Sequence, residues 1–233
     1  MEPDESIAVP PLGHRVMNAG CVVRYRLGRV SRWLPPIRIA LGWLIVRELR
    51  ELNDALCSTP LAGRCWLGGG LLLGWAREGR VLDHDTGDVD FWVLAEDAQL
   101  VEEAADALRR RGFRRLWRYR NSRGDVTEYT FTRHGAKFEF FLLFPGSRPG
   151  RRVYFIYVED VELESEVSDQ PLESFEFLDR VWLKPRFHAE HLRETYGPWE
   201  VPDRSWSSAD APCVVAQRPW LKRSGAWSGG TAG

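Results

Sequence analysis

The sequence has few of the residues that mark a disulfide-stapled or membrane-spanning protein. It has four cysteines that form no CxxC pair: Cys21, Cys57, Cys65 and Cys213. This spacing favours free thiols without a catalytic or metal-binding role, in a reducing cytosol, over a zinc site or a disulfide framework. The longest apolar run, Ile39–Val46, is far shorter than the roughly 20 residues that a membrane helix needs. The acidic start MEPDES lacks the order of a signal peptide. We therefore expect a cytoplasmic protein with no transmembrane segment.

An excess of charge of either sign is also missing. The chain has 32 basic and 33 acidic residues and a formal net charge of -1, which argues against a nucleic-acid partner. Lysine is scarce, since 29 of the basic residues are arginine. That bias is typical of a GC-rich genome, or of a protein whose arginine forks bind phosphate. The 233 residues are 44% hydrophobic and 28% charged, as in a globular protein.

Composition divides the chain into three segments. Residues 1–30 mix Pro, Gly, Arg and acids without a period and predict a flexible leader, with one short ordered piece around Cys21–Tyr25. Residues 209–233 end in the Gly- and Ser-rich RSGAWSGGTAG and predict a flexible tail. Residues 31–208 remain as a single domain.

The predicted fold class of this domain is α+β, with a mixed central sheet flanked by helices. Apolar residues spaced three and four apart predict a helix over 37–56, and a second helix begins after Asp97 and ends at Gly112. β-Branched and aromatic runs predict strands over 88–95, 113–119, 126–133, 137–144 and 153–158, with a tight turn at 134–136. A helical C-terminal region follows, so we expect a single, mostly antiparallel or mixed sheet.

The most informative stretch is CWLGGGLLLGWAREGRVLDHDTGDVDFWV at residues 65–93. Its glycine run, residues 68–70, would let backbone N–H groups approach phosphate oxygens, although a plain turn has the same composition. Asp88 and Asp90 open an apolar strand, and side chains two residues apart on a strand project to the same face. Two adjacent carboxylates suit Mg²⁺ (or Mn²⁺) bound together with substrate phosphates, whereas the plainer alternative is a solvated loop.

A third carboxylate, Glu139, interrupts the apolar run KFEFFLLF at residues 137–144. Burying an unpaired charge is costly, so Glu139 needs a partner. In one interpretation the partner is Lys137 or a nearby arginine. In the other, Glu139 is a third ligand that completes the metal site from a neighbouring strand.

A glycine turn, a DxD strand and an acid on a later strand resemble the nucleotidyltransferase fold. More narrowly, GGGLLLGWAREGRVLDHDTGDVDFWV resembles the LicD and fukutin family, in which a GTLLG run and an arginine precede a DxD strand. A second block, at residues 177–206, is similar to the family's closing pattern of a proline, a short helix, Tyr-Gly, and then a Trp and a Pro. Its members here are Pro185, Tyr196, Gly197, Trp199 and Pro202. The resemblance covers about residues 60–206.

The sequence departs from the family pattern at three places. Gly70-Leu71 stands where the family has Gly-Thr or Gly-Ser, so a hydroxyl that would touch phosphate is missing. HDTGDVD replaces a run such as PWDDDID, with one residue more before the DxD pair and Asp85 as the outer acid. Glu139 stands where the family commonly has Asp.

The resemblance implies Mg²⁺-dependent transfer of a phosphate-linked group, of the phosphocholine or polyol phosphate type. The donor would be a CDP-activated, nucleotide-diphosphate-linked compound, and the acceptor a hydroxyl of a glycan or a similar molecule. The catalytic and metal-ligating residues implied are Asp88, Asp90 and Glu139, with Glu139 completing the site or taking the acceptor proton. The residues implied to bind the donor phosphates are Gly69, Gly70, Arg77 and Asp85, although Arg77 would also fit a surface helix.

The second block predicts a helix over His188–Thr195 that packs on the sheet beside the site. Gly197 is expected to supply the left-handed residue that ends this helix, and Trp199 to bury its ring with an N–H that needs a partner. His188 and His191 share one face of the helix, but nothing nearby completes a metal ligand set, so we interpret them as structural.

Two other functions fit the motifs. WLGGG followed by HDTGDVD also resembles the antibiotic nucleotidyltransferases, which attach a nucleoside monophosphate to an aminoglycoside or lincosamide; the Tyr196-Gly197 block favours the first interpretation. A catalytically silent nucleotide-binding module is the alternative of another class. Such a module has no need of a dicarboxylate strand.

Overall fold

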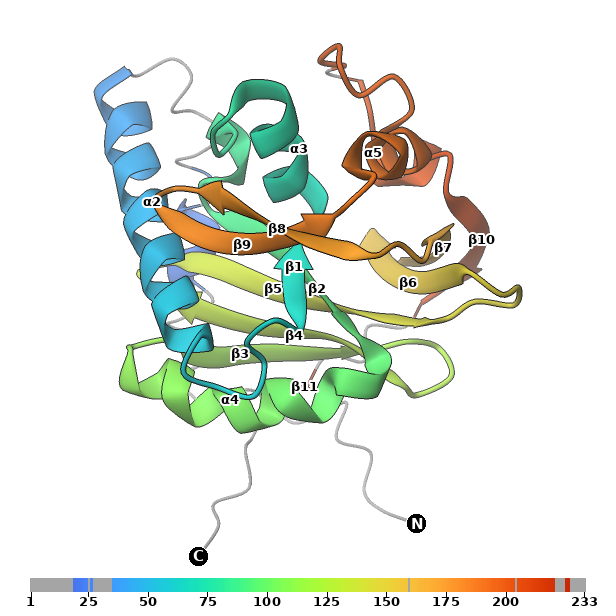
Figure 1. Ribbon diagram of the computed structural model, residues 1–233, viewed down its shortest axis with the longest axis horizontal. Coiled ribbons are helices and arrows are strands. Elements are labelled where there is room, and N and C mark those ends of the chain that lie inside the picture. The colour runs from blue at the N-terminus through green and yellow to red at the C-terminus, as the bar shows by residue number, and fades with distance from the viewer. Residues whose placement is uncertain are drawn as a thin grey trace, which may run out of the picture.

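The fold is α+β, with helices around a mixed nine-stranded sheet and a separate two-stranded hairpin (Figure 1). The computed structural model describes residues 19–24, 26, 35–158, 160–203, 205–220 and 225–226. The helices are α2 (Pro35–Leu56), α3 (Gly69–Glu78), α4 (Ala98–Arg110) and α5 (His188–Tyr196). The strands are β1 (Cys65–Leu67), β2 (Asp88–Leu94), β3 (Arg114–Arg120), β4 (Val126–Arg133), β5 (Ala136–Pro145), β6 (Arg151–Val158), β7 (Val161–Ser168), β8 (Leu172–Phe177), β9 (Arg180–Pro185), β10 (Val214–Pro219) and β11 (Gly225–Ala226).

Strand β5 organises the sheet because it pairs with three neighbours. It runs parallel to β2 and antiparallel to β4, and its last two residues pair with β6. The sheet continues through β7 to β10 on one side and through β3 to β11 on the other. The mixed sheet and the five strands expected from the sequence are therefore confirmed, each within two residues of the expected bounds.

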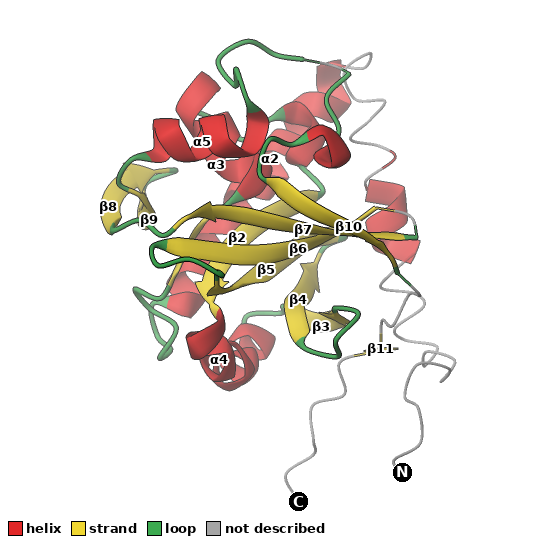
Figure 2. Ribbon diagram, turned by 90° about the vertical axis from the view of Figure 1, so that its right-hand side faces the viewer, coloured by secondary structure: helices red, strands yellow, loops and turns green. Residues whose placement is uncertain are grey.

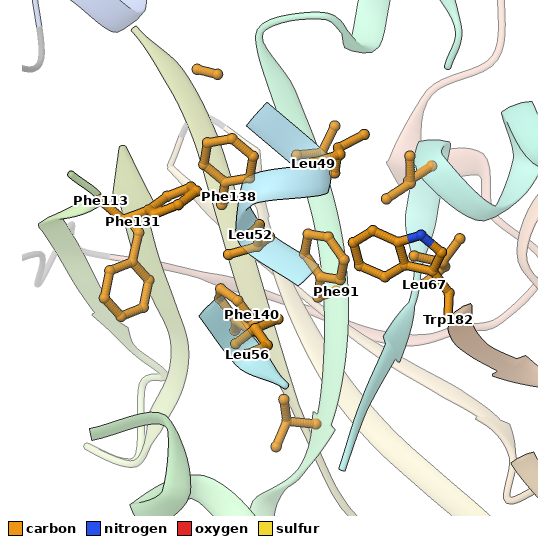
Figure 3. Packing of buried hydrophobic residues seen from close by; sticks show 14 of the residues in the cluster. Leu49, Leu52, Leu56, Leu67, Phe91, Phe113, Phe131, Phe138, Phe140 and Trp182 are labelled. Carbon is orange, nitrogen blue, oxygen red and sulfur yellow. The ribbon is translucent and has the colours of Figure 1, made fainter. Parts of the chain in front are cut away.

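The main hydrophobic core lies between the sheet and helices α2 and α4. Leu49, Leu52 and Leu56 from α2 pack over Phe91, Phe138 and Phe140 from β2 and β5 (Figure 3). This spacing of three and four along α2 confirms the helix that the apolar pattern predicted. The aromatic side chains point to this face because alternate residues of β2 and β5 do so, which turns Asp88, Asp90 and Glu139 toward the other face.

The expected helical C-terminal region is wrong in large part. Among the described residues of this region α5 is the one α-helix, with a single 3-10 turn at Ser208–Asp210, and residues 161–185 form β7 and the β8–β9 hairpin. Strand β7 has the sequence VELESEVS, and its three glutamates made it look unlike a buried strand in the sequence. These acids are paired by distant groups: Ser122 donates from its backbone N–H to Glu162 over 2.6 Å, and Arg148 donates to Glu166 over 2.7 Å.

The flexible tail expected from residue 209 is also wrong for its first part. Strand β10 pairs with β7, and Trp220 is buried with its ring 4.2 Å from that of Tyr157. The Gly- and Ser-rich composition belongs only to the last residues of the chain, whereas residues 211–220 carry the apolar side chains that the sheet edge buries. Residues 1–18, most of the expected leader, and residues 227–233 lie outside the described residues.

Candidate functional site

Three carboxylates from two strands meet on the face of the sheet opposite the main core. In the parallel pairing of β2 with β5, Asp90 lies beside Glu139 and Asp88 lies beside Lys137. Carboxylate oxygens of Asp88, Asp90 and Glu139 lie within 4.8 Å of one another. The structure thus brings together the three residues that the sequence marked as metal ligands.

Lys137 bridges two of these carboxylates. Its Nζ donates to Asp88 Oδ2 over 2.9 Å and to Glu139 Oε1 over 2.6 Å. Both interpretations of Glu139 therefore agree with the structure in part. Glu139 is paired with Lys137, and it also lies in the carboxylate cluster where a third metal ligand was expected. Asp88 Oδ1 is buried and has no hydrogen-bond partner among the described residues, so the lysine leaves part of the cluster unsatisfied.

The cluster holds more negative charge than one lysine balances. Burial, followed by the charge of Asp88, raises the pKa of Asp90 to about 8 and that of Glu139 to about 8. A further carboxyl, Glu128 on β4, is buried beside them; burial and Glu139 hold its pKa well above the ordinary value, although the Thr130 hydroxyl donates to it over 2.6 Å. Sequence reasoning missed Glu128 because VTEYTFTR looks like an ordinary alternating strand.

The glycine run forms the N-terminus of α3 rather than a free turn. Gly70 N–H points at Asp90 Oδ2 over 3.3 Å, so the positive end of the helix faces the cluster. Gly69 has φ +46°, and a Cβ there would lie 1.9 Å from Asp90 Oδ2. A Cβ on Gly70 would lie 2.3 Å from Asp85 Oδ2. Both positions therefore need glycine so that the helix can approach the two acids.

A cavity of about 810 Å³ opens beside Asp90, between α3, the 83–85 turn, α5 and the segment after α5. Helices α3 and α5 are neighbours in the fold (Figure 2). Its polar lining residues include Asp90, Gly69, Gly70, Arg77 and Asp85. Its aromatic lining residues are Trp92, Phe141, Tyr154, Tyr196, Trp199 and Trp206. A lining that combines charged and aromatic side chains suits a ligand with a charged part and an organic part.

Several buried polar atoms around this cavity have no hydrogen-bond partner among the described residues. They are Arg77 Nε, Asp85 Oδ2, Trp199 Nε1 and Trp206 Nε1. Burial and the neighbouring charge of Asp88 raise the pKa of Asp85 to about 7. Arg77 is largely buried in the cavity wall, so it is not the surface arginine of the alternative interpretation. Unsatisfied groups gathered around one cavity are typical of a binding site.

Helix α5 brings the second sequence block to the cavity. It spans the expected residues, and Gly197, with φ 72°, follows its end. Tyr196 and Trp199 both line the cavity. His191 is buried against the Trp92 ring, and burial lowers its pKa to about 4. His188 lies against the Trp75 ring, so the two histidines have the packing positions expected of structural residues.

The N-terminal residues 19–24 lie against the site, which the sequence did not reveal. Arg24 donates to the Thr86 carbonyl over 2.7 Å and to the His134 carbonyl over 3.1 Å. Cys21 Sγ lies 3.2 Å from Thr132 Oγ1, and Thr132 is the cross-strand neighbour of Lys137. The ordered piece expected around Cys21–Tyr25 is therefore present, but its place beside the site was not predicted, because that place depends on bonds to residues more than 60 positions away.

Comparison with known families agrees with this geometry. The model of one family, described as LicD/FKTN/FKRP, nucleotidyltransferase domain, matches residues 63–186, more than half of the chain, and the chain belongs to this family. None of the curated proteins matches it. Members of the family are transferases, which supports a transferase here, with a nucleotide-linked donor and a hydroxyl acceptor in general. Among the described residues, no helix is both long and apolar enough to cross a membrane.

Proposed function

We propose that this protein has a nucleotidyltransferase-like fold and transfers a phosphate-linked group from a CDP-activated donor to a hydroxyl of a glycan or a similar acceptor. The group would be of the phosphocholine or polyol phosphate type, and the reaction would depend on Mg²⁺ or Mn²⁺. One observation carries the proposal. The carboxylates of Asp88, Asp90 and Glu139 converge within 4.8 Å, and Asp90 faces a cavity of about 810 Å³ that is lined by both charged and aromatic side chains.

The residues present fit a divalent cation. Asp88 Oδ1 is a buried carboxylate oxygen without a partner among the described residues, and the crowded carboxylates repel one another. Hard oxygen ligands from carboxylates are those that Mg²⁺ binds, together with substrate phosphates. We assign Asp88, Asp90 and Glu139 as its ligands. When bound, the cation would neutralise charge on the donor phosphates.

The chain's own groups would position the donor and the acceptor. The N-terminus of α3 at Gly69 and Gly70 offers N–H groups and a positive partial charge to the phosphates. Arg77, whose buried Nε makes no hydrogen bond among the described residues and lies 3.6 Å from Glu78 Oε1, would hold a second phosphate oxygen. The aromatic side chains that line the cavity, Tyr196 and Trp199 among them, would exclude water from the organic part of the substrate.

The acceptor proton requires a base within reach of the cavity. Glu139 is tied to Lys137 over 2.6 Å and is outside the set of residues that line the cavity, so we assign it to ligation. Asp85 lines the cavity, and its Oδ2 is free of hydrogen bonds to the described residues. We therefore assign Asp85 as the group that accepts the proton from the attacking hydroxyl.

Product analysis tests the proposal. The enzyme is incubated with Mg²⁺, CDP-choline or a CDP-polyol, and a panel of glycans and polyols, and CMP is measured together with the transferred group. We expect CMP in wild type, a loss of 10²-fold or more in D90N and D85N, and no change in D106N, which alters an exposed acid on α4. Consumption of CTP or ATP with release of pyrophosphate would instead identify nucleoside monophosphate transfer. Tight nucleotide binding without any turnover would identify a silent binding module.

A further inference from the structure

The strands that carry the three carboxylates begin at two neighbouring turns. Strand β2 begins directly after the turn at 83–87, and β5 begins directly after the turn at 134–135. Because β2 and β5 pair in parallel, both turns lie at the same edge of the sheet. The Gly87 carbonyl, in the first turn, accepts from the Lys137 N–H over 2.9 Å. The convergence of the carboxylates therefore depends on how these turns are held relative to each other.

Arg24 links the two turns. Its Nε and Nη2 donate to the Thr86 carbonyl over 2.9 Å and 2.7 Å, and its Nη1 donates to the His134 carbonyl over 3.1 Å. Arg24 is 4% exposed, and burying a charged side chain is costly unless its donors are satisfied. The planar guanidinium presents its N–H groups in a fixed fork, so this one side chain sets the placement of one carbonyl relative to the other.

The helical segment around Arg24 packs closely on the second of these turns. Cys21 Sγ lies 3.2 Å from Thr132 Oγ1, near the end of β4. Gly135 has φ +77°, and a Cβ there would lie 3.0 Å from the Gly20 carbonyl oxygen and 3.4 Å from Arg24 Cβ. Glycine at this position therefore lets the segment come close enough for Arg24 to reach both carbonyls.

We propose that Arg24 is a positioning residue, which holds the two turns so that Asp88, Asp90 and Glu139 converge on a divalent cation. The inference rests on the cation site of the proposed function. It adds a residue from outside the range 63–186 that matches the family model. Arg24 acts on the carboxylates through the backbone of the turns that precede them, by fixing two carbonyl oxygens.

The test uses the full chain and two measurements that need no turnover. Calorimetric titration with Mn²⁺ alone gives the affinity of the carboxylate cluster for the cation, well below the melting temperature of every variant. Amide hydrogen exchange in chelator reports how firmly each turn is held without any metal.

Three variants separate the fork from its charge and from a general loss of stability. R24A removes the fork, whereas R24K keeps the charge but cannot place two carbonyls as a planar fork does. R120A is the matched control, because Arg120 Nη1 donates over 2.7 Å to the Gly124 carbonyl, in the turn between β3 and β4.

We expect R24A to bind Mn²⁺ about tenfold or more weakly than wild type, R24K about threefold or more weakly, and R120A as wild type does. Millimolar guanidinium should restore much of the affinity of R24A, because it can occupy the vacated site, whereas an equal concentration of NaCl should not. Exchange should be faster in R24A at the turns 83–87 and 134–135, and in R120A only at the turn 121–125.

Equal Mn²⁺ affinity of wild type and R24A would overturn the inference and leave the cation site in place. Wild-type affinity in R24K would overturn it as well, because charge rather than the fork would then matter. A wild type that binds no Mn²⁺ would contradict the proposed function. The exchange measurement would still decide on Arg24, since unchanged protection of both turns in R24A excludes that it holds them. If R24A fails to fold, R24K provides both measurements.

Discussion

The substitution D90N should stabilise the metal-free protein, because Asp90 is a buried carboxyl among other carboxyls. Its pKa is raised to about 8, and Gly70 N–H is the donor that faces it, over 3.3 Å. In the unfolded chain an aspartate has a pKa near 3.8. At pH 7 folding must therefore put a proton on this carboxyl, which costs up to about 4 kcal/mol at roughly 1.4 kcal/mol for each pH unit.

D90N removes that cost and keeps an oxygen for the Gly70 N–H. We expect a gain of about 2–4 kcal/mol without metal, or a melting temperature higher by roughly 5–15 °C. A raised pKa means that stability is lost as pH rises from the unfolded value toward the folded value. The advantage of D90N should therefore be small at pH 4, larger at pH 7 and complete above about pH 8.

The assay is thermal unfolding in chelator and again in millimolar Mg²⁺, with D106N as the control on an exposed acid. Mg²⁺ should raise the melting temperature of wild type and leave that of D90N unchanged. D106N should follow wild type within about 0.5 kcal/mol in both buffers. A D90N protein that melts well below wild type in chelator would refute the reasoning, because it would make Asp90 one half of a structural ion pair.

Four further results are expected. E139Q should lower turnover by 10²-fold or more; survival of turnover with lower stability would leave Glu139 as merely the partner of Lys137. K137M should lower the melting temperature in chelator, by an amount corresponding to about 3–5 kcal/mol, and Mg²⁺ should recover part of it, because Asp88 and Glu139 lose their cation. In urea unfolding, lowering the pH from 7 to 4.5 should destabilise wild type by about 2–3 kcal/mol relative to H191F, because burial lowers the pKa of His191 to about 4 in the folded protein. A chain that ends at Ser208 should unfold at a lower temperature than the full chain, because it lacks β10; an equal melting temperature would show that the β7–β10 pairing contributes nothing.

The sequence was sufficient to predict those helices and strands in which the spacing of apolar residues matches the face that the fold buries. Helix α2 and strand β5 have apolar periods that match their buried faces, so their bounds were predicted within two residues. Strand β7 was missed because its glutamates are satisfied by Arg148, Arg218 and the Ser122 loop, none of which is near it in sequence. Local composition has no access to such long-range compensation.

In the candidate site, too, the features that depend on local sequence were predicted, and those that depend on tertiary contacts were not. Asp88 and Asp90 share a face by strand geometry alone, and their prediction needed no tertiary information. The bridge from Lys137 depends on the register between β2 and β5, and the cavity depends on where α5 returns to the sheet. The place of Arg24 beside the site follows from bonds to backbone carbonyls, which any sequence offers. These features therefore required the structure.

The central claim is that the three carboxylates form a divalent cation site, and a crystal grown with Mn²⁺ and CMP tests it most directly. The account predicts an anomalous peak about 2.1 Å from oxygens of Asp88, Asp90 and Glu139, with Lys137 Nζ withdrawn from at least one of the two carboxylates that it now bridges. The same crystal of D90N should lack the peak. Full-length protein that places Mn²⁺ elsewhere, while Lys137 still bridges Asp88 and Glu139, would contradict the account.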